Sequence, residues 1–148
     1  MTGSHHLDTQ ARRILVCEDD AATAWALGMI LTDAGYTVIG PARTAEQALQ
    51  EAYSQTPDVA LIDIGLSGMI DGISVAGELT PLGIPVIFLT GDYRRAMEEA
   101  RDLAVDILIK PIEVVELLRT VSAALDRRDR SRRDDPVNAL ASSAKGLG

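Results

Sequence analysis

The sequence predicts an α/β protein built on a doubly wound, five-stranded parallel sheet with a (βα)5 order. Three observations support this class. Five short apolar runs alternate with five segments of helical length. Several of the runs are continuously apolar rather than alternating, which is typical of strands covered on both faces. A strand–helix unit repeated five times places helices on both sides of a parallel sheet.

Each element has its own sequence signal. The expected strands are residues 14–17, 37–39, 59–63, 86–89 and 106–109, and the expected helices are 21–34, 44–55, 73–79, 93–103 and 113–125. Gly35 is a good residue for ending the first helix, because glycine accepts the left-handed backbone found there. Thr44 and Gln47 form a capping box that opens the second helix. Pro81 stops the third.

The composition indicates one acidic globular domain. The chain has 148 residues, a net charge of −8 and 47% apolar residues, values that fit a single ordered unit. Its one cysteine, Cys17, excludes an internal disulfide framework and favours a small core residue over a reactive thiol. With no secretion signal and no apolar stretch that could span a bilayer, we expect a cytoplasmic protein without membrane contacts.

Charge is distributed unevenly along the chain. Residues 1–126 hold 8 basic and 19 acidic side chains, whereas residues 127–148 hold 6 basic and 3 acidic ones. We therefore expect a flexible N-terminus over 1–11, the ordered domain over 12–126, and an Arg-rich tail over 127–148 that is a frayed helix end followed by disorder. An acidic body without a helix-turn-helix disfavours nucleic acid as a partner of this tail.

Chemically active side chains follow four of the five expected strands. Glu18 and Asp19 come after the first strand, Asp63 ends the third, Thr90 follows the fourth and Lys110 follows the fifth. Ligands of open parallel sheets bind beyond the carboxyl ends of the strands, where all these groups would meet. The first pair could instead cap the following helix, and each of the others alone could be a solvated loop residue. Their coincidence at the strand ends favours a site.

Clustered carboxylates repel one another and call for a cation. Oxygen ligands without histidine or cysteine favour a hard ion, and Mg²⁺ first. A lysine beside such an ion supplies a second positive charge against the oxygens of a phosphoryl group. The set suits an aspartate nucleophile that accepts a phosphoryl group by positioning and charge neutralisation.

Four segments around the expected strand ends resemble the motifs of a known family. The segments Ile-Leu-Val-Cys-Glu-Asp-Asp (14–20), Leu-Ile-Asp-Ile (61–64), Phe-Leu-Thr-Gly (88–91) and Ile-Lys-Pro (109–111) are similar to the motifs of the response-regulator receiver domain of two-component signalling. They occur in the family's order and spacing over about 12–126. The resemblance implies the flavodoxin-like receiver fold with strand order 2-1-3-4-5, here of the stand-alone, single-domain type.

The resemblance also implies roles for individual residues. Asp63 corresponds to the phosphoacceptor, and Asp19 to the direct ligand of Mg²⁺. Glu18 matches the acid that holds the ion chiefly through water, and the backbone carbonyl of Gly65 the third protein ligand. Lys110 would pair with Asp63 or its phosphoryl group. The implied activity is not enzymatic turnover but Mg²⁺-dependent self-phosphorylation and self-dephosphorylation.

Two further implications concern signalling. Thr90 would shift toward the phosphoryl group on activation, and the peptide bond before Pro111 would be cis. The implied donors are a histidine kinase or a histidine phosphotransfer domain, and the phosphorylated form would bind a protein or act as a phosphate sink.

The sequence departs from the family pattern in two places. Three residues before Lys110 the family commonly has an aromatic switch residue, where this chain has Ile107. The loop over 65–72 is unusually rich in glycine, which suggests mobility around Gly65. With Ile107 in that position, we expect an order–disorder change over residues 90–103 to carry the signal.

Two other classes compete with this interpretation. An aspartate-nucleophile phosphatase of the haloacid-dehalogenase type needs Asp-x-Asp after the first strand, where this chain has Glu-Asp-Asp. A flavodoxin-like protein that binds FMN or another small ligand needs a Ser/Thr/Gly phosphate loop there, and three acids would repel the phosphate. The sequence therefore disfavours both without excluding either.

The first helix carries an unusual apolar strip. On a helical wheel, the stripe that should face the sheet is Leu27, Ile30, Leu31 and Ala34. Ala22, Trp25 and Met29 then fall together on another side. If the helix is rotated, Trp25 is a core residue. Otherwise Trp25 and Met29 form an exposed strip beside the Asp63 pocket, where they would contact the helical phosphotransfer domain of a kinase or a second copy of this chain.

Overall fold

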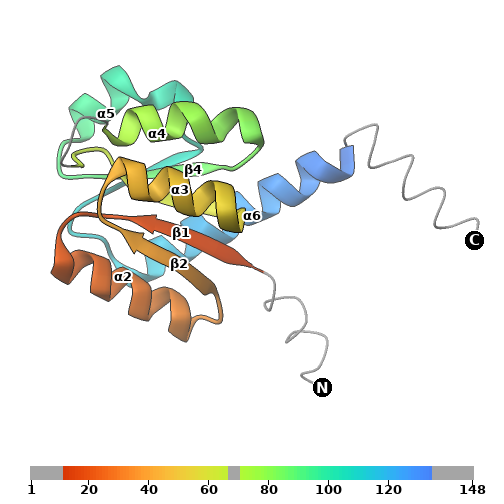
Figure 1. Ribbon diagram of the computed structural model, residues 1–148, viewed down its shortest axis with the longest axis horizontal. Coiled ribbons are helices and arrows are strands. Elements are labelled where there is room, and N and C mark those ends of the chain that lie inside the picture. Colours follow the sequence, from red (N-terminus) through yellow and green to blue (C-terminus); the bar gives the residue numbers. More distant parts are fainter. Residues whose placement is uncertain (1–11, 67–70, 135–148) are drawn as a thin grey trace, which may run out of the picture.

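The computed structural model describes residues 12–66 and 71–134. Its strands and helices follow one another in a regular alternation (Figure 1). The strands are β1 (Arg13–Cys17), β2 (Thr37–Ala42), β3 (Val59–Asp63), β4 (Val86–Thr90) and β5 (Asp106–Ile109). The helices are α2 (Ala21–Asp33), α3 (Ala45–Gln55), α4 (Gly72–Leu79), α5 (Tyr93–Glu99) and α6 (Val114–Asp134), with 3-10 turns at Thr80–Leu82 and Arg101–Leu103.

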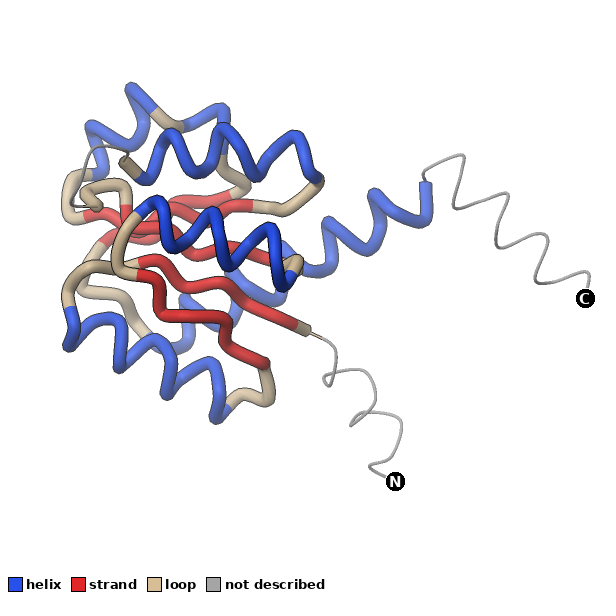
Figure 2. Tube along the Cα trace, in the orientation of Figure 1, coloured by secondary structure: helices blue, strands red, loops and turns tan. Residues whose placement is uncertain are grey.

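The five strands form one sheet, and every pair is parallel. The strand order is β2-β1-β3-β4-β5, as the family resemblance implied. Helices cover both faces, so that the molecule has three layers (Figure 2). One core cluster packs α3, α4 and α5 against the sheet, and the other packs α2 and α6 against the opposite face. The predicted doubly wound α/β fold is confirmed.

The residues that follow the strands begin the helices. Asp20, Thr44, Asp71 and Asp92 each cap a helix by accepting a hydrogen bond from the backbone amide three residues later. Such caps satisfy amide groups that the first turn leaves without partners. The carboxyl edge of the sheet is thus also the edge at which four helices start, and the loops across it are short.

Before α6, element boundaries differ from the sequence prediction by more than one residue in two places. β2 continues past Ile39 to Ala42, which pairs with Cys17 after a shift in register. The helix expected over 93–103 ends at Glu99, and a 3-10 turn follows. That tighter turn, with the Leu103 amide bonded to the Ala100 carbonyl, brings Leu103 against the core.

The largest difference is the length of α6. The ordered domain was expected to end at residue 126, but α6 runs to Asp134 and projects beyond the sheet (Figure 1). Two ion pairs connect the extra turns to the residues directly before β3 and β1: Arg128 Nη1 lies 2.8 Å from Asp58 Oδ1, and Arg12 pairs with Asp129. Residues 1–11 and the rest of the predicted tail, 135–148, lie outside the described residues.

The fold also bears on Cys17 and on the character of the helices. Cys17 is fully buried in the core, and burial raises the pKa of its thiol to about 12, so it is not a reactive thiolate. Across the described ranges, none of the helices has the length and apolar character that crossing a bilayer requires.

Candidate functional site

Three carboxylates meet at the carboxyl edge of the sheet. Glu18 and Asp19 follow β1, Asp63 is the last residue of β3, and the parallel pairing of β1 with β3 brings them together. Each offers an oxygen atom, and these oxygens all lie within 4.8 Å of one another. Glu18 and Asp63 are buried. Of the three consecutive acids after β1, only Asp20 caps the helix that follows, so the capping interpretation does not account for the other two.

Lys110 supplies the positive charge within this cluster. Its backbone amide donates to the Thr90 carbonyl at 2.8 Å, which extends the β4–β5 pairing into the loop. Its ammonium group forms an ion pair with Glu18, and Nζ lies 3.3 Å from Asp63 Oδ2. The peptide bond that joins Lys110 to Pro111 is cis, as the resemblance implied. The Lys110 ammonium group therefore pairs with two carboxylates, those of Glu18 and Asp63.

The shared charge perturbs the acid–base behaviour of both partners. Burial, reinforced by Asp63, raises the pKa of Glu18 to about 7. Burial alone would lower the pKa of Lys110, but the ion pair with Glu18 and the charge of Asp63 outweigh it and raise that pKa. The raised pKa values of Glu18 and Lys110 are both consistent with an excess of negative charge in this cluster. The cluster favours a bound proton or cation.

The donor set fits a hard divalent ion. Three carboxylates at this spacing, with no sulfur or imidazole among them, match the ligands that Mg²⁺ accepts, with water completing the shell. Gly65 lies two residues beyond Asp63 and donates its amide to Asp63 Oδ1 at 2.9 Å. The backbone carbonyl of Gly65, expected as a ligand, thus belongs to a turn that is tied to the same aspartate.

Thr90 stands at the same edge, at the end of β4, and is buried. Its hydroxyl oxygen accepts a hydrogen bond from the Asp92 amide at 2.9 Å and donates to the Asp92 carbonyl at 3.1 Å. Both hydrogen bonds of the Thr90 hydroxyl therefore stay within the loop that follows β4. The movement toward Asp63 that the resemblance implies requires these two bonds to break.

Two residues at the site were not singled out from the sequence. A Cβ atom on Gly72 would lie 2.3 Å from the backbone oxygen of Asp63, so only glycine lets α4 begin this close to the strand end. Gly72 is thus needed for the close packing of α4 against the end of β3. Arg43 Nη2 donates to the Asp19 carbonyl at 3.1 Å. Residues 67–70 of the loop lie outside the described residues.

The apolar strip on α2 is exposed, but its position differs from the prediction. Trp25 is 69% exposed and Met29 45%, so neither is a core residue. Both line a groove against β2 and its end, together with Val38 and Pro41. The opposite side of α2 carries the groove that contains Lys110, lined by Ala22, Ala26 and Ile30.

The helical wheel explains this division. Leu27 and Leu31 are buried against the sheet, with Ala24 beside them, whereas Ala34 is exposed because the helix ends at Asp33. The two grooves lie on either side of the exposed face of α2, opposite the buried stripe. Trp25 therefore lines the groove beside β2, and Ala26 lines the groove that contains Lys110. Ala22, which the sequence grouped with Trp25, lies in the Lys110 groove.

The fold and the site together define the receiver class of α/β proteins: a parallel sheet whose carboxyl edge presents a buried aspartate to two further acids and a lysine. A comparison with known families gives the same answer. Residues 14–122 match the response regulator receiver domain. This chain belongs to that family, and the phosphatase and flavin-carrier alternatives no longer stand.

Individual curated regulatory proteins are also similar to this chain over most of its length. The chain is 32% identical to the transcriptional regulatory protein PdtaR of Mycobacterium tuberculosis over 78% of its own length, and 35% identical to the DNA-binding response regulator MtrA of the same organism over 90%. In both cases it covers 58% of the relative, so the chain spans little more than half of the curated proteins it matches.

Solved structures show the same fold. The signal receiver domain of a modulated diguanylate cyclase from Desulfovibrio desulfuricans superimposes with a TM-score of 0.75 at 29% identity, covering 80% of this chain and 97% of that one. A CheY-like receiver domain protein from Methanospirillum hungatei gives a TM-score of 0.75 at 27% identity, covering 81% and 98%.

Proposed function

We propose that this chain receives a phosphoryl group on Asp63 from a phosphohistidine of a histidine kinase or of a histidine phosphotransfer domain. The observation that carries the proposal is the placement of the Asp63 carboxylate between two other acids and the Lys110 ammonium group. The family supports this role, because receiver domains act in response regulators.

The transfer needs positioning more than covalent help from other residues. An oxygen of Asp63 attacks phosphorus, the new O–P bond forms, and the N–P bond of the phosphohistidine breaks so that its electron pair returns to the imidazole. Lys110 balances charge on the phosphoryl oxygens, and Thr90 donates a hydrogen bond to one of them once it leaves Asp92. Glu18, Asp19, Asp63 and the Gly65 carbonyl would hold Mg²⁺, which when bound would supply positive charge against the remaining phosphoryl oxygens.

The reverse fate of the phosphoryl group is hydrolysis at the same site. Water attacks phosphorus, the O–P bond breaks, and the Asp63 carboxylate is regenerated. We propose no substrate turnover beyond this self-phosphorylation and self-dephosphorylation. The chain would then act by protein–protein interaction in its phosphorylated form, or by draining phosphoryl groups from a kinase.

Incubation with acetyl phosphate and Mg²⁺, followed by intact mass measurement, tests this function. The wild type should gain one acid-labile phosphoryl group. Asp63→Asn should gain none while keeping its fold, because the side chains have the same shape and one of the carboxylates that share Lys110 is removed. Asp102→Asn, at an exposed acid far along the chain, is the matched control and should label like the wild type. Full labelling of Asp63→Asn would overturn the assignment.

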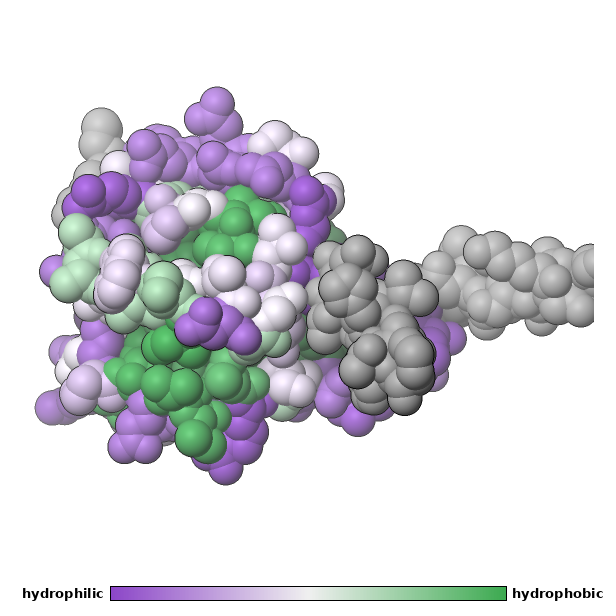
Figure 3. Space-filling view, turned by 90° about the horizontal axis from the view of Figure 1, so that it is seen from below, coloured by the Kyte–Doolittle hydropathy of each residue, from purple (hydrophilic) through white to green (hydrophobic). Residues whose placement is uncertain are grey.

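We further propose that the donor protein docks on α2. Between Ala21 and Thr32 this helix has no charged residue, although half of these residues are exposed. A helix that is apolar on all sides is normally covered. Figure 3, which views the molecule from the side of α2, shows a continuous hydrophobic area there. Because the Lys110 groove borders the site, a helical donor seated across α2 would reach Asp63 and contact Trp25 and Met29.

The test of docking is Trp25→Glu. The variant should fold normally, because the side chain is 69% exposed, and should label from acetyl phosphate, but should lose transfer from the kinase or phosphotransfer domain. Leu82→Glu, at another exposed apolar residue, is the matched control and should keep transfer. Unchanged transfer and an unchanged oligomeric state in Trp25→Glu would contradict the contact. Loss of dimerisation instead would assign the strip to a second copy.

We propose that an order–disorder change in residues 90–103 carries the signal of phosphorylation. Ile107, which stands where the family commonly has an aromatic residue, borders a hollow of about 230 Å³ lined also by Tyr93, Met97 and Arg101. Release of Thr90 from Asp92 would loosen the start of α5 beside this hollow. Amide spectra with and without beryllofluoride should differ over this segment, and identical spectra would rule the change out.

A further inference from the structure

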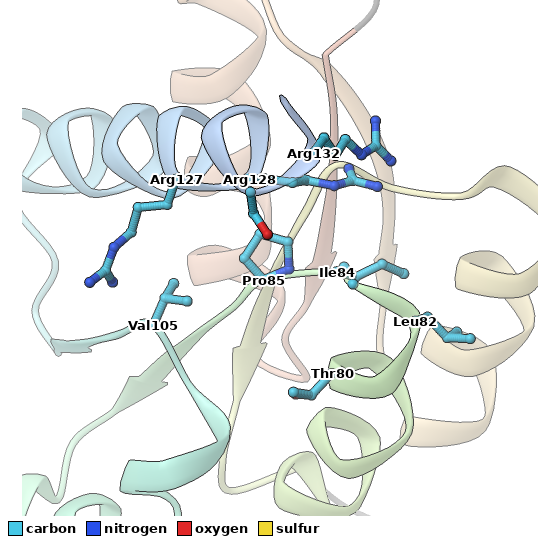
Figure 4. Close-up of a pocket in the computed structure, with 10 residues that line it drawn as sticks. Thr80, Leu82, Ile84, Pro85, Val105, Arg127, Arg128 and Arg132 are labelled. Atoms are coloured by element: carbon cyan, nitrogen blue, oxygen red, sulfur yellow. The ribbon is translucent and has the colours of Figure 1, made fainter. Parts of the chain in front are cut away.

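The arginine that is buried at the amino ends of the strands has a structural role. A cavity of about 520 Å³ adjoins the amino ends of β4 and β5, and Arg127, Arg128 and Arg132 of α6 contribute to its wall (Figure 4). Arg128 is paired with Asp58 at 2.8 Å and donates to the Pro57 carbonyl at 3.2 Å. These contacts join α6 to the segment before β3. A different kind of arginine contact occurs at the opposite, carboxyl edge of the sheet.

A bulge in β2 brings Arg43 to this carboxyl edge. β1 and β2 pair in register up to Ile39, after which the register shifts so that Ala42 lies opposite Cys17. The skipped part of β2 includes Gly40, which has a φ of +94° and where a Cβ atom would lie 2.5 Å from the Ala42 nitrogen, so the bulge requires glycine. Bulges beside functional sites often redirect the side chains that follow them.

The backbone around Arg43 is held on both sides. The Glu18 amide donates to the Ala42 carbonyl at 2.9 Å, which continues the β1–β2 pairing to the first acid of the cluster. The Arg43 amide donates to Gln47 Oε1 at 2.9 Å, in the first turn of α3. From this fixed position the exposed side chain reaches back across the edge, where Nη2 donates to the Asp19 carbonyl at 3.1 Å.

The peptide group between Asp19 and Asp20 is thereby held at both of its polar atoms. Its carbonyl oxygen accepts the hydrogen bond from Arg43, and its N–H donates to Glu18 Oε2 at 3.2 Å. The Asp20 side chain in turn caps α2 by accepting from the Thr23 amide at 2.9 Å. Hydrogen bonds behind a metal ligand set its orientation, and these bonds fix the backbone that carries the Asp19 carboxylate.

We propose that Arg43 is a positioning residue, which holds the backbone of Asp19 so that the carboxylate is directed toward Mg²⁺. This inference rests on the proposed function, because it takes Asp19 as a ligand of that ion. Arg43 acts through Asp19 and needs no contact with the phosphoryl group. Loss of its side chain should therefore weaken the binding of Mg²⁺ and leave the transfer rate at saturating Mg²⁺ unchanged.

The charge of Arg43 makes the sign of the effect informative. A guanidinium group beside the acid cluster repels a divalent cation, although water and salt screen an exposed side chain. If charge were its only influence, removal of Arg43 would tighten the binding of Mg²⁺. If Arg43 positions Asp19, its removal weakens that binding. The two roles thus predict opposite changes in one dissociation constant.

The test is a titration of the melting temperature with Mg²⁺ in the absence of a phosphodonor. Arg43→Ala should stay folded, because the side chain is exposed, and its dissociation constant for Mg²⁺ should rise about tenfold, as for other residues that orient metal ligands. Arg43→Lys keeps a donor and the charge, and should recover most of the affinity. Arg119→Ala removes the same charge from an exposed position of α6 and is the matched control, with a change of less than about twofold.

Labelling by acetyl phosphate completes the test. Arg43→Ala should label slowly at low Mg²⁺ and at the wild-type rate once Mg²⁺ is saturating. Unchanged or tighter binding of Mg²⁺ in Arg43→Ala would overturn the proposal, as would slow labelling that persists at saturating Mg²⁺. The titration needs no phosphoryl group, so a failure of Asp63 to accept one would overturn the proposed function without removing an Arg43 effect. No Mg²⁺-dependent shift in the wild type would overturn the role of Arg43 together with the metal site.

Discussion

The two ends of one parallel sheet carry opposite charge in this protein. At the carboxyl end, Glu18, Asp19 and Asp63 share a single lysine. At the amino end, three arginines of α6 line a cavity that has no acidic residue in its wall. The first arrangement follows from topology, because strand ends must meet. The second depends on how far one helix continues past the sheet.

Of the changes at these two ends of the sheet, the loss of Arg128 should have the largest effect on stability. Arg128→Ala should lower the free energy of unfolding by about 2–3 kcal/mol, because it leaves the partly buried Asp58 without its ion-pair partner. Arg130→Ala, at an exposed position on the same helix, should change it by less than about 0.5 kcal/mol. Urea denaturation measures both. Equal effects would mean that the last turns of α6 are not part of the folded unit.

At the carboxyl end the corresponding experiment is a pH series without metal. Burial, reinforced by Asp63, raises the pKa of Glu18 from its ordinary value of 4.5 to about 7. Between these values the folded protein holds a proton that the unfolded chain has released, so stability falls as the pH rises through this window. We expect a loss of about 1–2 kcal/mol between pH 5 and pH 7.5, after allowing for solvent screening.

Glu18→Gln is the variant that checks this pH effect. It cannot titrate, so the stability of the variant should be nearly flat over the same range. Asp20 and Asp129 do not interfere, because neighbouring groups lower the pKa of each carboxyl below its ordinary value of 3.8. A slope as steep in Glu18→Gln as in the wild type would assign the effect to another group.

Magnesium should give the smallest effect. Mg²⁺ at a few times its dissociation constant stabilises the folded state by about 1 kcal/mol by mass action, which appears as a higher melting temperature. Asp19→Ala should abolish this rise. Asp20→Ala should be less stable, because it removes the cap of α2, yet should keep the rise. A shift that persists in Asp19→Ala would contradict the proposed metal site.

The sequence predicts the carboxyl end well for a physical reason. Glu18, Asp63, Thr90 and Lys110 each lie at or directly after the end of a strand. Parallel strands bring their carboxyl ends to one edge whatever the loops do. Gly72 could not be recognised in the same way, because its role depends on how closely α4 approaches Asp63. An Asp-Gly pair at a helix start was its only signal.

The amino end and the surface of α2 were harder to predict. The Arg-rich composition of residues 127–134 predicts a frayed helix end, whereas α6 continues to Asp134 and is held by ion pairs of Asp129 with Arg12 and of Arg128 with Asp58. The periodicity of α2 predicts the exposure of Trp25. It does not predict which side of the exposed face of α2 lies beside Lys110, because that depends on the positions of β2 and of the loop after β5.

The identity of the carboxylate that carries the phosphoryl group is the most direct test of the proposed function. After phosphorylation with acetyl phosphate and Mg²⁺, borohydride reduction converts an aspartyl phosphate to homoserine, and peptide mass spectrometry locates that residue. We predict homoserine at position 63 and nowhere else in the chain. Homoserine at position 19, or the absence of any reduced residue in a protein that has gained a phosphoryl group, would contradict the central role of Asp63.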